Sequence, residues 1–239
     1  MLAVEGLPEI GQGAQVGRLI AERAELGKAD VVVVSQKIVS KAEGRVRRLS
    51  EVLIGAKARR LAARVGKEAA LVQLILEESS EVLRAERGVL ITETRNGIVC
   101  ANAGIDSSNL AEAGAVSLLP VDPDASARRL RAETGGEAAV VISDSIGRAW
   151  RLGQAEVAIG CAGLRPLDDW RGRSDAAGRP LRATMIAIAD EAAAAADLVR
   201  DKASRIPAAI VRGLGRYVEE DDGPGAAALR RPPEEDLFR

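Results

Sequence analysis

The sequence predicts an α+β (mixed α/β) protein with mixed sheets and flanking helices. Runs of β-branched apolar residues, long enough for buried strands, alternate along the chain with segments whose apolar residues recur every three or four positions. Between two β-rich runs stands Asn96-Gly97, a strong hairpin signal. Because strands and helices mix throughout and no internal repeat is visible, we expect parallel and antiparallel strands in the same fold.

The elements of the first half follow from the period of their apolar residues and from the turn residues between them. They are expected as a short strand that runs into a proline turn (2–10), an amphipathic helix (14–27), a continuous buried strand (29–41) and two helices broken near Gly66 (56–86).

The second half is divided by the same signals. It is expected to hold the hairpin (88–104), a helix with an acidic start and a terminal glycine (122–135), a buried strand (137–145), a strand that enters an alanine-rich helix (181–203) and a last strand (206–214). We expect residues 1–218 to form one domain. Residues 219–239 are rich in charge, proline and glycine, and we expect them to form a loosely ordered arm or to pack on a partner subunit.

The chain of 239 residues has no histidine, and this excludes several kinds of site. Nucleophilic Ser-His or Cys-His systems and His-ligated zinc are ruled out within the chain. A metal would need oxygen ligands, which indicates Mg²⁺, Mn²⁺ or Ca²⁺. Cys100 and Cys161 lie in apolar segments without CxxC spacing, so we expect buried free thiols.

Composition also bounds the partners. Lys and Arg number 34 against 35 Asp and Glu, which gives no reason to expect nucleic acid or a membrane as partner. No apolar run approaches the roughly 18 residues of a transmembrane helix. The N-terminus lacks a signal-type basic start and apolar core, so a cytoplasmic location is expected.

Two aspartates follow strand-like runs. Asp144 comes at the end of the apolar run at 137–145 and is followed by Ser145, while Asp106 follows "NAGI". Ligands of α/β sheets bind at the carboxyl ends of strands, and two carboxylates with a hydroxyl suit Mg²⁺ or Mn²⁺ beside phosphate oxygens. Alternatively, both aspartates form Asx turns or cap helices.

Cationic and acidic candidates complete the pattern. At strand spacing, Lys37 and Lys41 share a face and could hold a phosphate; the alternative is two solvated surface lysines. Asp190 and Glu191 stand at a strand-to-helix turn, where they either favour the helix dipole, add to a metal site or act as a base. No P-loop or dinucleotide fingerprint is present.

Nine stretches in this order resemble the coenzyme F-420-0:γ-glutamyl ligases. They are "GLPEI", "VVVVSQKIVSKAEGR", "LEESSEVLR", "NAGIDSSN", "LLPVDPDASARRLR", "VVISDSIGRAWRLGQAEVAIGCAGL", "DWRGRSDAAGRPL", "ADEAAAAADLV" and "IPAAIVRGLG". The resemblance covers roughly residues 4–216, and the chain looks like the stand-alone ligase without the C-terminal flavin reductase-like domain of some members.

The resemblance implies a GTP-dependent ligase that attaches L-glutamate to a deazaflavin coenzyme precursor through an acyl phosphate and then extends a γ-glutamyl tail. It also implies Mg²⁺ or Mn²⁺, a monovalent cation such as K⁺, and an intertwined homodimer. By matching motif, the metal ligands would be Asp106, Asp144 and Ser145. The GTP-binding positions would be Leu7, Pro8, Glu9, Ile10, Lys41 and Asn109.

Other readings remain open. Gln36 stands where relatives place a serine that contacts the nucleotide, and an amide can still hydrogen-bond there. Aromatic residues make up only 2% of the chain, which leaves room for a carboxylate acceptor other than a deazaflavin. A non-catalytic nucleotide-binding protein is the alternative from a different functional class. No residue is assigned as the catalytic base.

Overall fold

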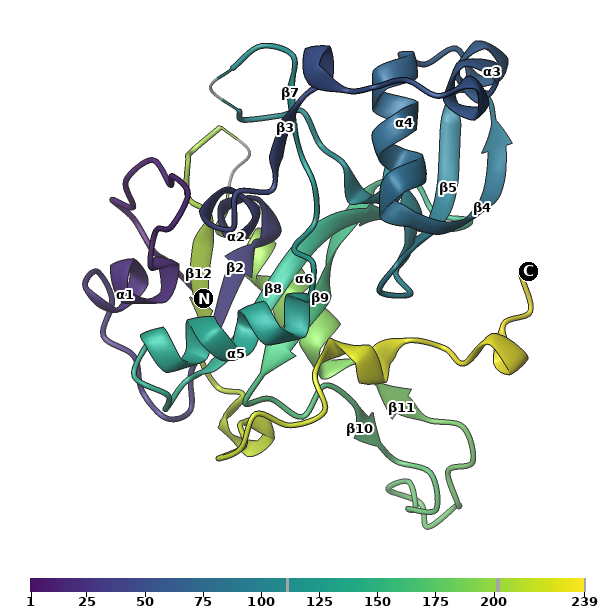
Figure 1. Cartoon of the computed structure of the whole chain (residues 1–239). Coiled ribbons are helices and arrows are strands. Elements are labelled where there is room, and N and C mark those ends of the chain that lie inside the picture. The colour runs from purple at the N-terminus through teal and green to yellow at the C-terminus, as the bar shows by residue number, and fades with distance from the viewer. Residues whose placement is uncertain (111, 201–202, 239) are drawn as a thin grey trace.

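A five-stranded mixed sheet organises the larger part of the molecule (Figure 1). The computed structural model describes residues 1–110, 112–200 and 203–238. The strands in spatial order are β1 (Leu2–Ala3), β12 (Ala208–Val211), β2 (Val31–Ser35), β8 (Ala139–Gly147) and β9 (Gln154–Ala162). Only the β2–β8 pair is parallel among these neighbours. The predicted mixture of strand directions and the α+β class are confirmed.

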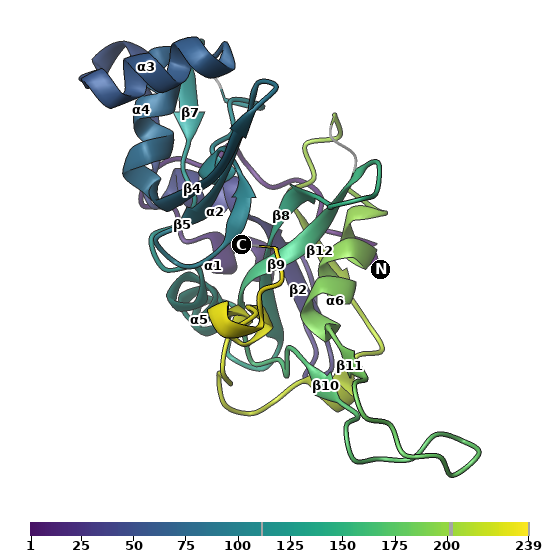
Figure 2. The same cartoon turned by 90° about the vertical axis from the view of Figure 1, so that its right-hand side faces the viewer.

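Helices cover both faces of this sheet because β2 and β8 are apolar on both sides. Val32, Val34 and Ile142 pack toward α1 (Val16–Ala21) and α5 (Pro123–Glu133). Val33 and Val141 pack toward the alanine-rich α6 (Ile188–Asp197). Figure 2 shows α6 on one side of the sheet and α1 and α5 on the other.

A smaller unit stands beside the sheet, at the top right of Figure 1. Helices α3 (Ala56–Val65) and α4 (Ala69–Glu78) pack on a three-stranded sheet with its own apolar cluster. Its strands are β4 (Ser79–Glu86), β5 (Val89–Thr94) and β6 (Val99–Ala101). The hairpin predicted around Asn96-Gly97 joins β5 to β6, and Gly97 has the positive φ of 74° that such a turn needs.

Within the residues that the structure describes, two short ribbons and five 3-10 turns complete the fold. The ribbons pair β3 (Val46–Arg48) with β7 (Ala115–Ser117) and β10 (Asp168–Asp169) with β11 (Met185–Ile186). The turns are Leu49–Glu51, Asn102–Gly104, Gly215–Tyr217, Ala226–Leu229 and Pro233–Glu235. Among the described residues, no helix is long and apolar enough to cross a membrane.

Three predictions of strand or helix are wrong, and one predicted helix is shorter than expected. The strand expected over 29–41 ends at Ser35, and Gln36–Ala42 form helix α2. Short apolar runs do not distinguish strand from helix, and here Ser40 Oγ donates to Gln36 Oε1 at 2.9 Å, one helical turn away. The helix expected over 14–27 is shortened to Val16–Ala21.

The second error concerns residues 79–86, which were expected to be helical. They form β4, which pairs antiparallel with β5 across a turn at Arg87-Gly88. Both turn residues have positive φ, 50° and 77°, as a tight hairpin requires. Pairing with β5 therefore overrides the helical reading of "SSEVLRAE".

The third error concerns Asp144, which does not end its strand. β8 continues to Gly147 and turns into β9, a strand that the glycine-rich composition concealed. Asp144 nevertheless lies just past Ser143, the last β8 residue paired with β2. It therefore still stands at the carboxyl edge of the parallel pair.

The C-terminal arm begins against its own chain. Arg131 of α5 donates to the carbonyl oxygens of Glu219, Glu220 and Asp221, and Asp124 accepts from the backbone of Ala226 and Ala227. The stretch 219–227 therefore contacts α5 of its own chain. The loose order of the arm and its boundary at residue 218 stay predictions.

Candidate active site

One cavity of about 890 Å³ gathers the residues that the sequence singled out. All nine predicted site residues line it: Leu7, Pro8, Glu9, Ile10, Lys41, Asp106, Asn109, Asp144 and Ser145. Gln36 and Lys37 line it too. The N-terminal loop, α2, the loop after Asn102–Gly104 and the β8–β9 ribbon therefore meet around a single volume, although they are far apart in sequence.

Asp106 is fixed in place by its backbone and its side chain. Its N–H and C=O exchange hydrogen bonds with Ser117 at 3.1 and 2.8 Å. Its Oδ1 accepts from the backbone N–H of Ser108 at 2.7 Å, which is the Asx turn considered as the alternative. Asp106 thus forms a turn and faces the cavity at once, so the two readings are compatible.

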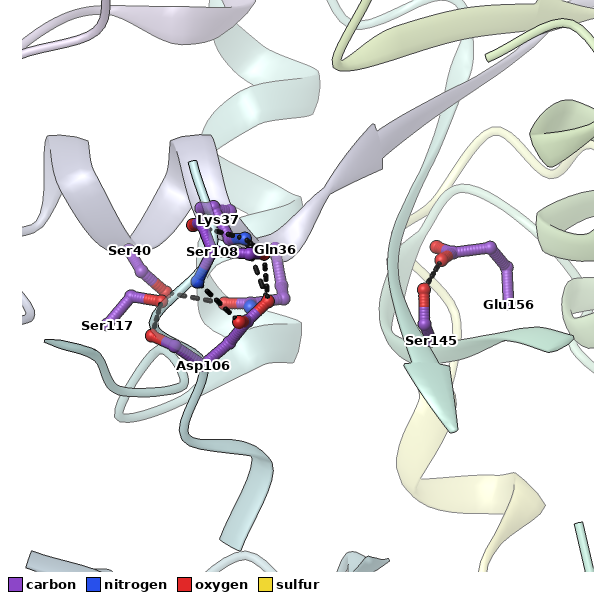
Figure 3. Close-up of polar contacts among 8 residues, drawn as sticks. All are labelled: Gln36, Lys37, Ser40, Asp106, Ser108, Ser117, Ser145 and Glu156. Atoms are coloured by element: carbon purple, nitrogen blue, oxygen red, sulfur yellow. Dashed lines mark hydrogen bonds and ion pairs between the residues drawn. The ribbon is translucent and has the colours of Figure 1, made fainter. Parts of the chain in front are cut away.

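Lys37 binds this same turn (Figure 3). Its Nζ lies 2.8 Å from Asp106 Oδ2, 2.7 Å from the carbonyl oxygen of Ser108 and 2.6 Å from Ser108 Oγ. Burial alone would raise the pKa of Asp106, but the hydrogen bonds from Lys37 and Ser108 outweigh it and hold that pKa below its ordinary value. Asp106 is therefore a charged, paired carboxylate.

Lys41 lies one helical turn further along α2. It shares a face with Lys37 by helical rather than strand spacing, which corrects the reason given for their alignment. Its Nζ is 2.6 Å from Oε1 of Glu9, a residue of the predicted nucleotide-binding loop. The Lys41 side chain is only 11% exposed, so neither lysine is the solvated surface residue of the alternative reading.

The opposite side of the cavity is acidic. Burial, followed by the nearby carboxylate of Glu156, raises the pKa of Asp144 to about 7. Asp144 makes no ion pair with any residue that the structure describes. A carboxyl group crowded by other carboxyl groups favours a bound cation or a proton.

Glu156 is a cavity residue that sequence reasoning missed. Its Oε1 accepts from Ser145 Oγ, and its Oε2 accepts from Ser143 Oγ at 2.6 Å and from Arg200 Nη2 at 3.1 Å. Arg200 also lines the cavity. The signal was indirect: β9 was not recognised, so the pairing that sets Glu156 opposite Ser145 could not be inferred.

The remaining candidates lie elsewhere. Asp190 accepts a hydrogen bond from the backbone of Ala158 at 2.9 Å and does not line the cavity, and neither does Glu191. Asp190 thereby joins α6 to β9, which favours its structural reading. Both cysteines are buried and free as predicted, and burial raises the pKa of each thiol to about 12.

Comparison with known proteins assigns the family. The sequence model described as F420-0:Gamma-glutamyl ligase matches residues 6–213. The chain belongs to this family. The resemblance read from the nine motifs is thereby confirmed.

Relatives cover the whole chain. The coenzyme F420:L-glutamate ligase of Methanothermobacter thermautotrophicus is 44% identical over 249 residues, which span 100% of this chain and 98% of that protein. That of Archaeoglobus fulgidus is 43% identical over 99% of this chain and 94% of its own length. That of Methanocaldococcus jannaschii is 38% identical, over 96% and 92%.

The cavity described above lies within the part of the chain that the family model matches. Residues 6–213 include every cavity-lining residue named here. Among the described residues, no three Asp, Glu or Cys side chains converge on one metal position.

Proposed function

We propose that this protein is a GTP-dependent ligase that attaches L-glutamate to the coenzyme F420 precursor through an acyl phosphate and then extends the γ-glutamyl tail. The observation that carries the proposal is the convergence of all nine motif-derived residues on one cavity of about 890 Å³. Family membership and relatives whose names state the same ligase activity support it.

The residues on the acidic side suit Mg²⁺ or Mn²⁺. Asp144 has a pKa raised to about 7 by burial and by Glu156, so a cation beside it would relieve an unfavourable charge distribution. Asp106 and Ser145 line the same cavity, and all three offer the hard oxygen atoms that these ions prefer. A bound divalent cation would neutralise charge on the phosphates.

The nucleotide is proposed to lie along the N-terminal loop and α2. Leu7, Pro8 and Ile10 supply apolar contacts, and Lys41 and Asn109 supply polar ones. Lys41 is already held at the cavity by Glu9, so its charge needs little reorganisation to meet a phosphate. Gln36 is 2% exposed and its Oε1 is engaged by Ser40, which leaves its amide N–H₂ as the group that could contact the ligand.

The chemistry needs charge stabilisation more than a nucleophilic side chain. Phosphoryl transfer to the acceptor's carboxylate gives an acyl phosphate, and the amine of L-glutamate then displaces phosphate and forms the amide. Lysines and carboxylates around one volume fit that requirement, and a histidine-free chain can carry it out. The proposal includes a monovalent cation such as K⁺ and a homodimer, as the family resemblance implies.

The direct test is product formation. Purified protein is incubated with GTP, Mn²⁺, L-glutamate and the precursor, and GDP and glutamylated product are followed by mass spectrometry. Stoichiometric GDP and product are expected, and their absence under all these conditions refutes the ligase. If an Asp106→Asn, Asp144→Asn double variant retained GTP and Mn²⁺ binding by calorimetry, the non-catalytic reading would gain and the metal assignment would fail.

One observation favours a second candidate acceptor. None of the described residues that line the cavity is aromatic, so the cavity offers no ring for stacking a deazaflavin. A ligase with the same chemistry and another carboxylate acceptor is consistent with that lining. Competition among a panel of carboxylates, read by mass spectrometry, decides between the two acceptors.

A further inference from the structure

All three N–H donors of Lys37 are used by the turn that Asp106 and Ser108 form. An ammonium group has three N–H donors, and the Nζ of Lys37 has three acceptors within 2.8 Å, all from Asp106 and Ser108. The Lys37 side chain is 13% exposed. In this arrangement no donor of Lys37 is left for a phosphate or carboxylate in the cavity that it lines.

The Asp106 carboxylate is similarly occupied. A carboxylate has about four lone-pair positions. Oδ2 accepts from Lys37 and from Ser108 Oγ, and Oδ1 accepts from the Ser108 N–H. A cation that approached Asp106 would meet one open position and a neighbouring positive charge.

The positive charge of Lys37 also reaches across the cavity. It acts on Asp144 and partly offsets the effects of Glu156 and Asp106 on that carboxyl group. The charge of Lys37 thus favours the ionised form of both predicted metal-binding carboxylates. A divalent cation bound between the same groups would do the same with twice the charge.

We propose that Lys37 holds the place of the divalent cation in the metal-free protein, and that metal binding displaces it from Asp106 toward the anionic groups of the substrate. The inference deepens the proposed function and rests on it, because it takes Asp106 as a metal-binding carboxylate. Lys37 is a positioning residue in the metal-free state. Once released, it presents three donors to phosphate or carboxylate oxygens in the cavity.

Lys41 provides a matched control. It carries the same charge, lies on the same helix, lines the same cavity and is similarly buried. Its partner, however, is Glu9, which is 76% exposed and is not a predicted metal ligand. Removing Lys41 therefore changes the cavity's overall charge without freeing Asp106.

The test measures Mn²⁺ affinity without nucleotide, from the electron paramagnetic resonance signal of free Mn²⁺. Lys37→Met should bind Mn²⁺ about tenfold more tightly than Lys41→Met, which corrects for the loss of one positive charge. Ser108→Ala removes one acceptor of Lys37 and one donor to Asp106, and should tighten binding about two- to threefold in an intact fold. Thermal unfolding of each variant verifies folding.

The outcomes separate the two hypotheses. If Lys37→Met and Ser108→Ala bind Mn²⁺ no more tightly than Lys41→Met, Lys37 is a fixed structural tie and the inference is overturned. Asp106→Asn reports on the proposed function instead: unchanged Mn²⁺ affinity in that variant removes Asp106 from the metal site. Loss of binding in Asp106→Asn with tightening in Lys37→Met supports both.

Discussion

The cavity has a loop side, where Asp106 lies, and a β8–β9 side, where Asp144 lies. The charges of these two aspartates are compensated to different extents. On the loop side, Asp106 is matched by Lys37 and by the Ser108 backbone, and its pKa lies below the ordinary value. On the β8–β9 side, Asp144 has carboxyl neighbours and no ion pair with a described residue, and its pKa is raised to about 7. Two aspartates that line the same cavity thus have pKa values shifted in opposite directions.

The difference determines how each carboxylate responds to an approaching cation. A paired carboxylate is stable without ligand and must give up a partner to bind a cation. A crowded carboxylate is destabilised without ligand and gains from a cation directly. Five predictions test this contrast, from the largest expected effect to the smallest.

Both aspartates should be needed for activity, whatever their state in the free protein. Asp106→Asn and Asp144→Asn should each lower the rate of GDP formation at least about 100-fold, because each removes a carboxylate proposed to hold the divalent cation that would stabilise the phosphoryl transition state. Steady-state assays at saturating Mn²⁺ measure the loss. A variant that kept more than a tenth of wild-type activity would show that its side of the cavity is dispensable.

The buried ion pair between Arg200 and Glu156 should have the largest effect on the free energy of unfolding. Arg200→Met leaves Glu156 buried without its cation and should lower the free energy of unfolding by about 3 kcal/mol. Adding Glu156→Leu should recover much of that loss. Chemical denaturation measures both.

Arg48→Met is the matched control for this prediction. Arg48 pairs with Glu112 at 2.7 Å, and the two side chains are 55% and 52% exposed, so its removal should leave the free energy of unfolding nearly unchanged. Equal effects of Arg200→Met and Arg48→Met would contradict a special role for burial.

The metal-free protein should respond oppositely to the two Asn variants. Asp144→Asn removes a crowded charge and should stabilise the protein at neutral pH by about 1 kcal/mol, while Asp106→Asn should destabilise it by a similar amount. Thermal unfolding in the presence of a chelator checks the signs. Shifts in the same direction would remove the contrast.

The pH dependence follows from the same shifts. The raised pKa of Asp144 means that its contribution to stability is full below about pH 4 and is lost as the pH rises toward about 7. The lowered pKa of Asp106 means that its contribution is present above about pH 4 and is lost in stronger acid. Asp144→Asn should flatten the first decline and leave the second.

The smallest effect is expected at Glu9. Because its side chain is 76% exposed, Glu9→Gln should change the free energy of unfolding by less than about 0.5 kcal/mol although the Lys41 ion pair is only 2.6 Å long. GTP affinity should change less than in Lys41→Met. Calorimetry of both variants measures the difference.

Sequence reasoning located the site well and its local geometry less well. The apolar runs of β2 and β8 dictated a buried sheet, and Asn96-Gly97 dictated a hairpin, because those patterns have few alternative structures. The start of α2, strand β4 and strand β9 were missed, since each depends on a partner that is distant in sequence or on an apolar run too short to show its period.

By itself, the sequence indicated the family, the absence of histidine chemistry and nine of the residues that line the cavity. Only the tertiary structure decided that Asp106 is paired by Lys37 while Asp144 faces Glu156. Charge compensation depends on distances between atoms of separate elements. Linear spacing fixes which groups are present, and folding fixes which of them neutralise one another.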